Sequence, residues 1–82
     1  MLTLGDLHIG QDAIIRVVGG EGELRHHLLD MGLTPGARIE CVGVSPGGDP
    51  RAFLVRGAVL ALRREDCLSI ILRTAEEGET WA

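Results

Sequence analysis

Three side chains that can bind a divalent metal ion lie close together in the sequence. Glu23, His26 and Asp30 stand at i, i+3 and i+7, a spacing that brings them toward one side of a helix. Carboxylate and imidazole groups are suitable ligands for transition metals. The same spacing also describes a solvated helix face with a His26–Asp30 pair, and no enclosing residues are visible around it. These residues are weak candidates for a metal site, and no cofactor is expected.

The glycine-rich run at residues 19–22 lies between a predicted strand and a predicted helix, where phosphate-binding loops occur. However, the chain contains no lysine and no GxxxxGK[ST] motif, and its glycine spacing does not match GxGxxG. Glu21 and Glu23 flank the start of the predicted helix, where they would repel an anion. The run therefore predicts a hinge rather than a phosphate site.

Nucleophilic catalysis has little support in the sequence. Ser45 and Ser69 lack the GxSxG setting of a serine nucleophile. Cys41 is predicted to point inward from a strand, where a buried thiol is inert. A pair between Cys67 and His26 or His27 stays open, although the spacing does not favour it. We predict no catalytic residues and no enzymatic activity.

Composition limits the remaining function classes. The chain has 82 residues, which predicts one domain, and a net charge of −4 with eight scattered arginines. One Phe, one Trp and no Tyr leave few stacking platforms for bases, and no basic stripe is present. Nucleic-acid binding is therefore not expected. The absence of a signal-like segment, of a bilayer-length apolar run and of paired cysteine motifs favours a cytoplasmic protein without membrane insertion.

Short strands dominate the predicted architecture. Alternating or β-branched runs predict five strands, at residues 13–18, 38–41, 51–55, 58–62 and 68–72. A helix is predicted at residues 23–31, after the first strand, and residues 63–67 form a polar link or one helical turn. Ala13, Ile15 and Val17 are expected to share one face. This pattern predicts a mainly β fold, a small closed or partly closed barrel.

The stretch LLDMGLTPG at residues 28–36 predicts how the helix ends. Gly32 suits the left-handed position that follows a helix. Pro35 and Gly36 suit the two central positions of a type II turn that directs the chain into the next strand. We therefore assign Gly32, Pro35 and Gly36 a structural role.

The faces of this helix suggest a binding surface. Leu24, Leu28 and Met31 form the stripe expected to contact the core. Leu29 is expected on nearly the opposite side, beside Arg25, and Leu33 either joins Leu29 in an exposed apolar contact or folds back onto the helix as part of its cap. An isolated exposed leucine would need no functional explanation.

Two motifs in this order resemble the ferrous iron transport protein A (FeoA) family. The first is Leu28, Met31, Gly32, Leu33, Pro35 and Gly36, and the second is Val55-Arg56-Gly57 followed by LALRRE at residues 60–65. The opening TLGDLHIGQDA is also similar to the family, and the resemblance covers about residues 2–73. It implies an SH3-like barrel of about five strands in a domain at residues 1–74. Residues 75–82 lie outside the resemblance, and their acidic composition without periodicity predicts a flexible tail.

The same resemblance implies a small cytoplasmic accessory protein of bacterial ferrous iron uptake. Its implied partner is the FeoB-type membrane transporter, on which Arg25, Leu29 and Leu33 are the expected docking residues. The alternative is a metal-binding chaperone or sensor related to the C-terminal barrel of iron-dependent repressors, using Glu23, His26 and Asp30. The sequence is also compatible with a homo-oligomer. Trp81 in the tail is either an anchor for a partner or part of a loose chain end.

Overall fold

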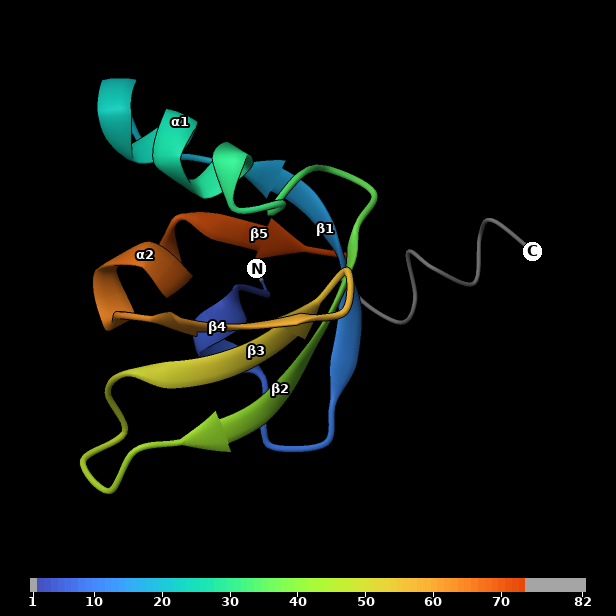
Figure 1. Ribbon diagram of the computed structural model, residues 1–82, viewed down its shortest axis with the longest axis vertical. Helices are drawn as coiled ribbons and strands as arrows, with labels where there is room; N and C mark the ends of the chain where they lie inside the picture. The colour runs from blue at the N-terminus through green and yellow to red at the C-terminus, as the bar shows by residue number, and fades with distance from the viewer. Residues whose placement is uncertain (1, 74–82) are drawn as a thin grey trace.

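Five antiparallel strands form the framework of the computed structural model, which describes residues 2–73. The strands are β1 (Asp12–Val18), β2 (Arg38–Val44), β3 (Arg51–Val55), β4 (Ala58–Leu62) and β5 (Ile70–Leu72), in the order β4-β3-β2-β1-β5. A 3-10 helix, η1 (Leu4–Asp6), precedes β1; α1 (Gly22–Asp30) joins β1 to β2, and α2 (Arg64–Leu68) joins β4 to β5 (Figure 1). The mainly β fold with one helix after the first strand is confirmed. The predicted tail and Trp81 lie outside the described residues.

Strand β1 pairs with two different neighbours along its length, which bends the sheet (Figure 1). Its first half, residues 12–14, pairs with β2, and its second half pairs with β5. A bulge lies between Ile15 and Val17, where two steps along β1 match one step along β5. The predicted shared face of Ala13, Ile15 and Val17 is therefore wrong, because the extra residue turns Val18 inward and leaves Val17 44% exposed.

The prediction of a strand at residues 68–72 is correct only for its second part. Residues 64–68 form α2, so the alternative of one helical turn in the polar link is the correct one. The helix buries Cys67 and leaves Leu68 60% exposed. Leu68 therefore belongs to the helix surface, and the last strand begins at Ile70.

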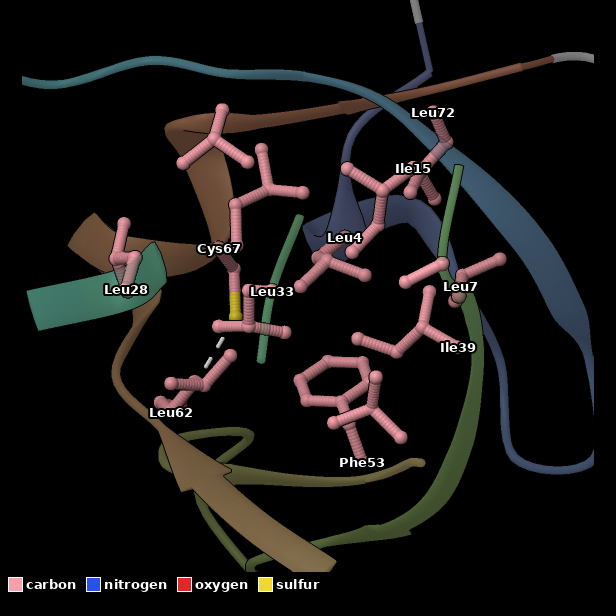
Figure 2. Packing of buried hydrophobic residues seen from close by; sticks show 14 of the residues in the cluster. Leu4, Leu7, Ile15, Leu28, Leu33, Ile39, Phe53, Leu62, Cys67 and Leu72 are labelled. Atoms are coloured by element: carbon pink, nitrogen blue, oxygen red, sulfur yellow. Dashed lines mark hydrogen bonds between the residues drawn. The ribbon is translucent and has the colours of Figure 1, made fainter. Parts of the chain in front are cut away.

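The core is almost entirely aliphatic, as the composition predicts. One ring, that of Phe53, lies among leucine, isoleucine and valine side chains and the two cysteines (Figure 2). No buried polar or charged side chain occurs within residues 2–73. Packing of apolar groups is therefore the main source of stability for this small domain.

The end of α1 has the hydrogen bonds of a Schellman motif. Gly32 donates its N–H to the Leu29 carbonyl at 3.0 Å, and Leu33 donates to the Leu28 carbonyl at 3.1 Å. Gly32 has a φ of 94°, in the region where a side chain is strained. Leu28 and Leu33 are both fully buried, and they supply the apolar contact that accompanies such a cap. The predicted role of Gly32 is confirmed.

A tight turn then directs the chain into β2. Ala37 donates its N–H to the Thr34 carbonyl at 3.0 Å across Pro35 and Gly36, and Gly36 has a φ of 90°. Two further backbone hydrogen bonds join this turn to β1. Gly36 donates its N–H to the Ile15 carbonyl at 2.8 Å, and Ile15 donates its N–H to the Ala37 carbonyl at 2.9 Å. The turn thus fixes the chain against β1 before β2 begins.

We expect Gly32→Ala to lower the free energy of unfolding by about 1–2 kcal/mol, because the left-handed conformation penalises any Cβ. The new Cβ would also lie 3.3 Å from Cδ of Arg56, closer than an ordinary contact. Urea unfolding followed by far-UV circular dichroism measures the loss.

Gly47→Ala is the matched control, because Gly47 has an ordinary φ and a Cβ added there would have no neighbouring atom within 4 Å. It should change stability by less than about 0.5 kcal/mol. Equal losses in the two variants would contradict the role assigned to Gly32.

Candidate functional site

The loop after α1 is held in place by an arginine from the hairpin that joins β3 to β4. Arg56 donates from Nε to the Gly32 carbonyl at 3.3 Å and from Nη2 to the Thr34 hydroxyl at 2.9 Å. Arg56 has a φ of 50° and Gly57 a φ of 80°, as a two-residue turn of type I′ requires. The sequence predicts the two strands on either side of this turn, but it does not predict the contact, because the two residues lie 24 positions apart.

The predicted docking residues occupy three different environments. Arg25 is exposed on α1, and its Nε donates to the Val18 carbonyl at 3.3 Å. Leu29 is half-buried and packs against the core cluster. Leu33 is fully buried.

Leu33 as an exposed docking residue is therefore a wrong prediction. The cap of α1 turns the chain back so that Leu33 packs into the core, as the alternative of a cap contact anticipated. Leu29 is also less exposed than predicted, because the stripe that contacts the core is wider than Leu24, Leu28 and Met31 alone. Arg25 and the uncovered part of Leu29 remain as the candidate docking surface on α1.

The three weak metal candidates do not form a cluster. Glu23, His26 and Asp30 are all exposed on α1. Within residues 2–73, no three His, Cys, Asp or Glu side chains are grouped so that they could hold a metal ion. Three exposed side chains on one helix face do not by themselves enclose or orient an ion.

Both cysteines are buried, free thiols. Cys41 is fully buried on β2, as its alternation predicts. Cys67 lies on α2 with 1% of its surface exposed, and its thiol donates a long hydrogen bond to the Leu62 carbonyl, 4.0 Å from Sγ (Figure 2). His26 and His27 are exposed on α1, so the structure does not bring them together with Cys67 as a catalytic pair.

Burial raises the pKa of the Cys67 thiol to about 11, although the nearby positive charge of Arg51 acts in the opposite direction. A thiol with this pKa is protonated at neutral pH, whereas the nucleophile is the thiolate. Cys67 is therefore a packing residue.

The glycine run before α1 has a structural explanation. Gly19 donates its N–H to the Ser69 carbonyl at 2.6 Å, and an added Cβ would lie 2.9 Å from that oxygen. Gly19 therefore allows the end of β1 to approach the residue that precedes β5. Glu21 and Glu23 are exposed beside the start of α1, a position unsuited to an anion.

No helix within residues 2–73 is long and apolar enough to cross a membrane.

Comparison with known proteins places the chain in a family. The FeoA domain family matches residues 2–74. A fusion protein of Fe(2+) transport protein A and the Fe(2+) transporter FeoB from Porphyromonas gingivalis is 36% identical over 79 residues. The chain belongs to the FeoA family. The match covers 96% of this chain but 9% of the fusion protein.

Solved structures agree with the FeoA assignment. Iron(II) transport protein A from Clostridium thermocellum is 32% identical, with a TM-score of 0.85, and the match covers 92% of this chain and 46% of that protein. FeoA from Stenotrophomonas maltophilia, described as a prokaryotic SH3 domain protein complexed with zinc, has a TM-score of 0.80 at 22% identity, covering 89% of this chain and 91% of that one. The predicted SH3-like fold is confirmed.

The two motifs that resemble FeoA meet in the structure. Arg56, from the Val55-Arg56-Gly57 motif, contacts Gly32 of the first motif and Thr34, which lies within the same stretch. In this FeoA-family chain, therefore, the motifs together form the connection from α1 to β2.

The raised pKa of Cys67 predicts a pH-dependent stability. The unfolded thiol titrates near 9.0 and the folded one near 11, so the folded state holds the proton more tightly. Below about pH 9 the protonated thiol makes its full contribution to the free energy of unfolding. As the pH rises from 9 toward 11, that contribution is lost, by at most about 1.4 kcal/mol per pH unit. Urea unfolding at several pH values between 8 and 11 measures this decline.

Cys67→Ala should flatten the decline, because it removes the titrating group. The variant will also lose stability at every pH through its smaller side chain, so the slopes are compared and not the absolute values. Identical slopes for the variant and the wild type would show that another group causes the pH dependence.

Proposed function

We propose that this chain is a small cytoplasmic accessory protein of bacterial ferrous iron uptake that docks on a FeoB-type transporter and modulates it. The observation that carries the proposal is the relative from Porphyromonas gingivalis, in which Fe(2+) transport protein A and FeoB form one polypeptide. Fusion of two modules converts their encounter into an intramolecular event with a high effective concentration. A separate chain of the same family would reach its transporter by a docking surface instead.

Helix α1 is the docking surface that we propose. It is the longest helix in residues 2–73 and lies on one side of the sheet, beside β1 and β5 in Figure 1. Arg25 is exposed on it, and arginine is enriched in protein interfaces. The uncovered part of Leu29 adds apolar area. Leu33 belongs to the core and supports this surface from below.

Modulation of a transporter by surface contact is consistent with the side chains of this domain. Both thiols are buried, and no cluster of three metal ligands occurs within residues 2–73. The chain therefore offers its partner a shaped surface rather than a reacting group. The alternative of a metal-binding chaperone or sensor has no observation of its own in this structure, and we do not propose it.

Binding to the soluble GTP-binding domain of a FeoB-type transporter tests the proposal, measured by calorimetry with and without guanine nucleotide. We expect Arg25→Glu to weaken binding by about fivefold, mainly through slower association, as charge reversals at interface rims do. Arg63→Glu is the matched control, because Arg63 is also exposed but precedes α2. It should leave the affinity unchanged.

A second variant, Leu29→Ala, tests the apolar part of the surface. Since Leu29 also packs against the core, its thermal unfolding must be measured alongside. If the folded Arg25→Glu and Leu29→Ala variants both bind like the wild type, α1 is not the docking surface. If the wild type does not bind at all, the proposed partnership is wrong.

A further inference from the structure

The outer face of β2 and β3 carries a groove that the proposed docking surface does not use. It has a volume of about 400 Å³ and is lined by Arg38, Glu40, Leu54, Arg56 and Gly57. Leu54 is 37% exposed in it. The groove therefore combines one exposed apolar side chain, Leu54, with two arginines and one glutamate, Glu40.

Apolar surface continues from the groove across β4. Val59 pairs directly with Leu54, so both side chains stand on the same face, and Val59 is 64% exposed. Ala52 and Ala61 form the next pair along the same two strands on that face. Strand β4 is also at the edge of the sheet and contains no charged residue. Natural proteins protect edge strands of this kind with charges or a covering segment.

The chain leaves β5 at the same end of the sheet as the arginines. Arg73 donates its N–H to the Ile14 carbonyl at 2.9 Å, and Ile14 pairs with Arg38 on β2. Because Ile39 pairs with Val55, the next residues in that direction are Arg38 and Arg56. The segment that follows Arg73 therefore starts at the same end of the sheet as the arginines of the groove, with β1 between Arg73 and β2.

That segment has the chemistry to fill the groove. Residues 74–82 read TAEEGETWA, with three glutamates, no basic residue and Trp81. Arg56 bonds to a carbonyl and a hydroxyl, and within residues 2–73 it has no carboxylate partner. Arg38 already pairs with Asp12, so Arg56 is the main cation available to the segment.

We propose that residues 74–82 dock on this groove in the same molecule. Trp81 packs on Leu54 and Val59, and the glutamates at 76, 77 and 79 lie toward Arg56. An indole over an arginine adds a cation–π contact. The segment thereby covers the apolar outer face of β3 and β4.

The length of the segment permits this arrangement. Passing from β5 over β1 and β2 to Leu54 on β3 takes three strand spacings, and reaching Val59 on β4 takes four, or roughly 19 Å. Trp81 follows Arg73 by eight residues, which extend to at most roughly 26–29 Å. The segment is therefore long enough to reach Leu54 and Val59 without a second molecule.

Trp81 makes the proposal directly measurable, because the chain has one Trp and no Tyr. In the isolated protein we expect a blue-shifted emission maximum and weaker acrylamide quenching than in a synthetic peptide of residues 74–82. Raising the salt concentration to about 1 M, where charges are screened beyond about 3 Å, should reduce the protection. No transporter is needed, so failure here would leave the proposed function standing.

Two variants disturb the contact from opposite sides. Replacing Glu76, Glu77 and Glu79 with Gln leaves the barrel untouched, and Val59→Glu places a like charge on an exposed position. Each should lower the ratio of docked to undocked segment by at least about fivefold, which corresponds to about 1 kcal/mol. Leu68→Glu is the control, because Leu68 is similarly exposed, at 60%, but lies on α2. It should leave the emission unchanged.

Several outcomes would overturn the proposal. One is quenching of wild-type Trp81 equal to that of the free peptide. Another is protection that survives both variants, which would place Trp81 elsewhere on the domain. Protection that grows with protein concentration would mean that the segment docks on a second copy rather than on its own groove.

Discussion

The fold depends on how the chain returns to the sheet after α1. The helix follows β1 directly, and within seven residues the chain must reverse and begin β2 beside it. A left-handed Gly32 makes the reversal possible, and the burial of Leu28 and Leu33 makes it favourable. Arg56 then joins this corner to the β3–β4 hairpin, so a local turn becomes a contact between distant parts of the chain. Because β2 is the central strand of the sheet, an error at this corner would displace every strand that pairs after it.

The second constraint is the bulge in β1. A strand that pairs with β2 at its start and β5 at its end must bend, and one extra residue provides the bend. The bulge brings Val18, rather than Val17, into line with Ile15 on the inner side. The same strand also receives the corner, through the bonds that join Ile15 to Gly36 and Ala37. Curvature of the sheet and placement of the helix are thus fixed at neighbouring residues.

The sequence predicted those features of the fold that depend on interactions between neighbouring residues. Alternation and β-branching identified β3 and β4 to the residue, and the glycine and proline positions identified the corner, because both depend on neighbours within a few residues. The bulge was missed, since only the pairing partner reveals the extra residue. The burial of Leu33 and the contacts of Arg56 were also misjudged or missed, because each depends on a residue distant in sequence. Of the three predicted docking residues, Leu33 is buried, and docking through α1 itself stays a prediction.

Arg56 also connects the two surfaces to which we assign binding. Its guanidinium bonds to Gly32 and Thr34 below the helix, and the same side chain lines the groove beside Leu54. Arg56 therefore lies where the β3–β4 hairpin, the groove and the corner below α1 meet, so a substitution of this residue would change all three at once.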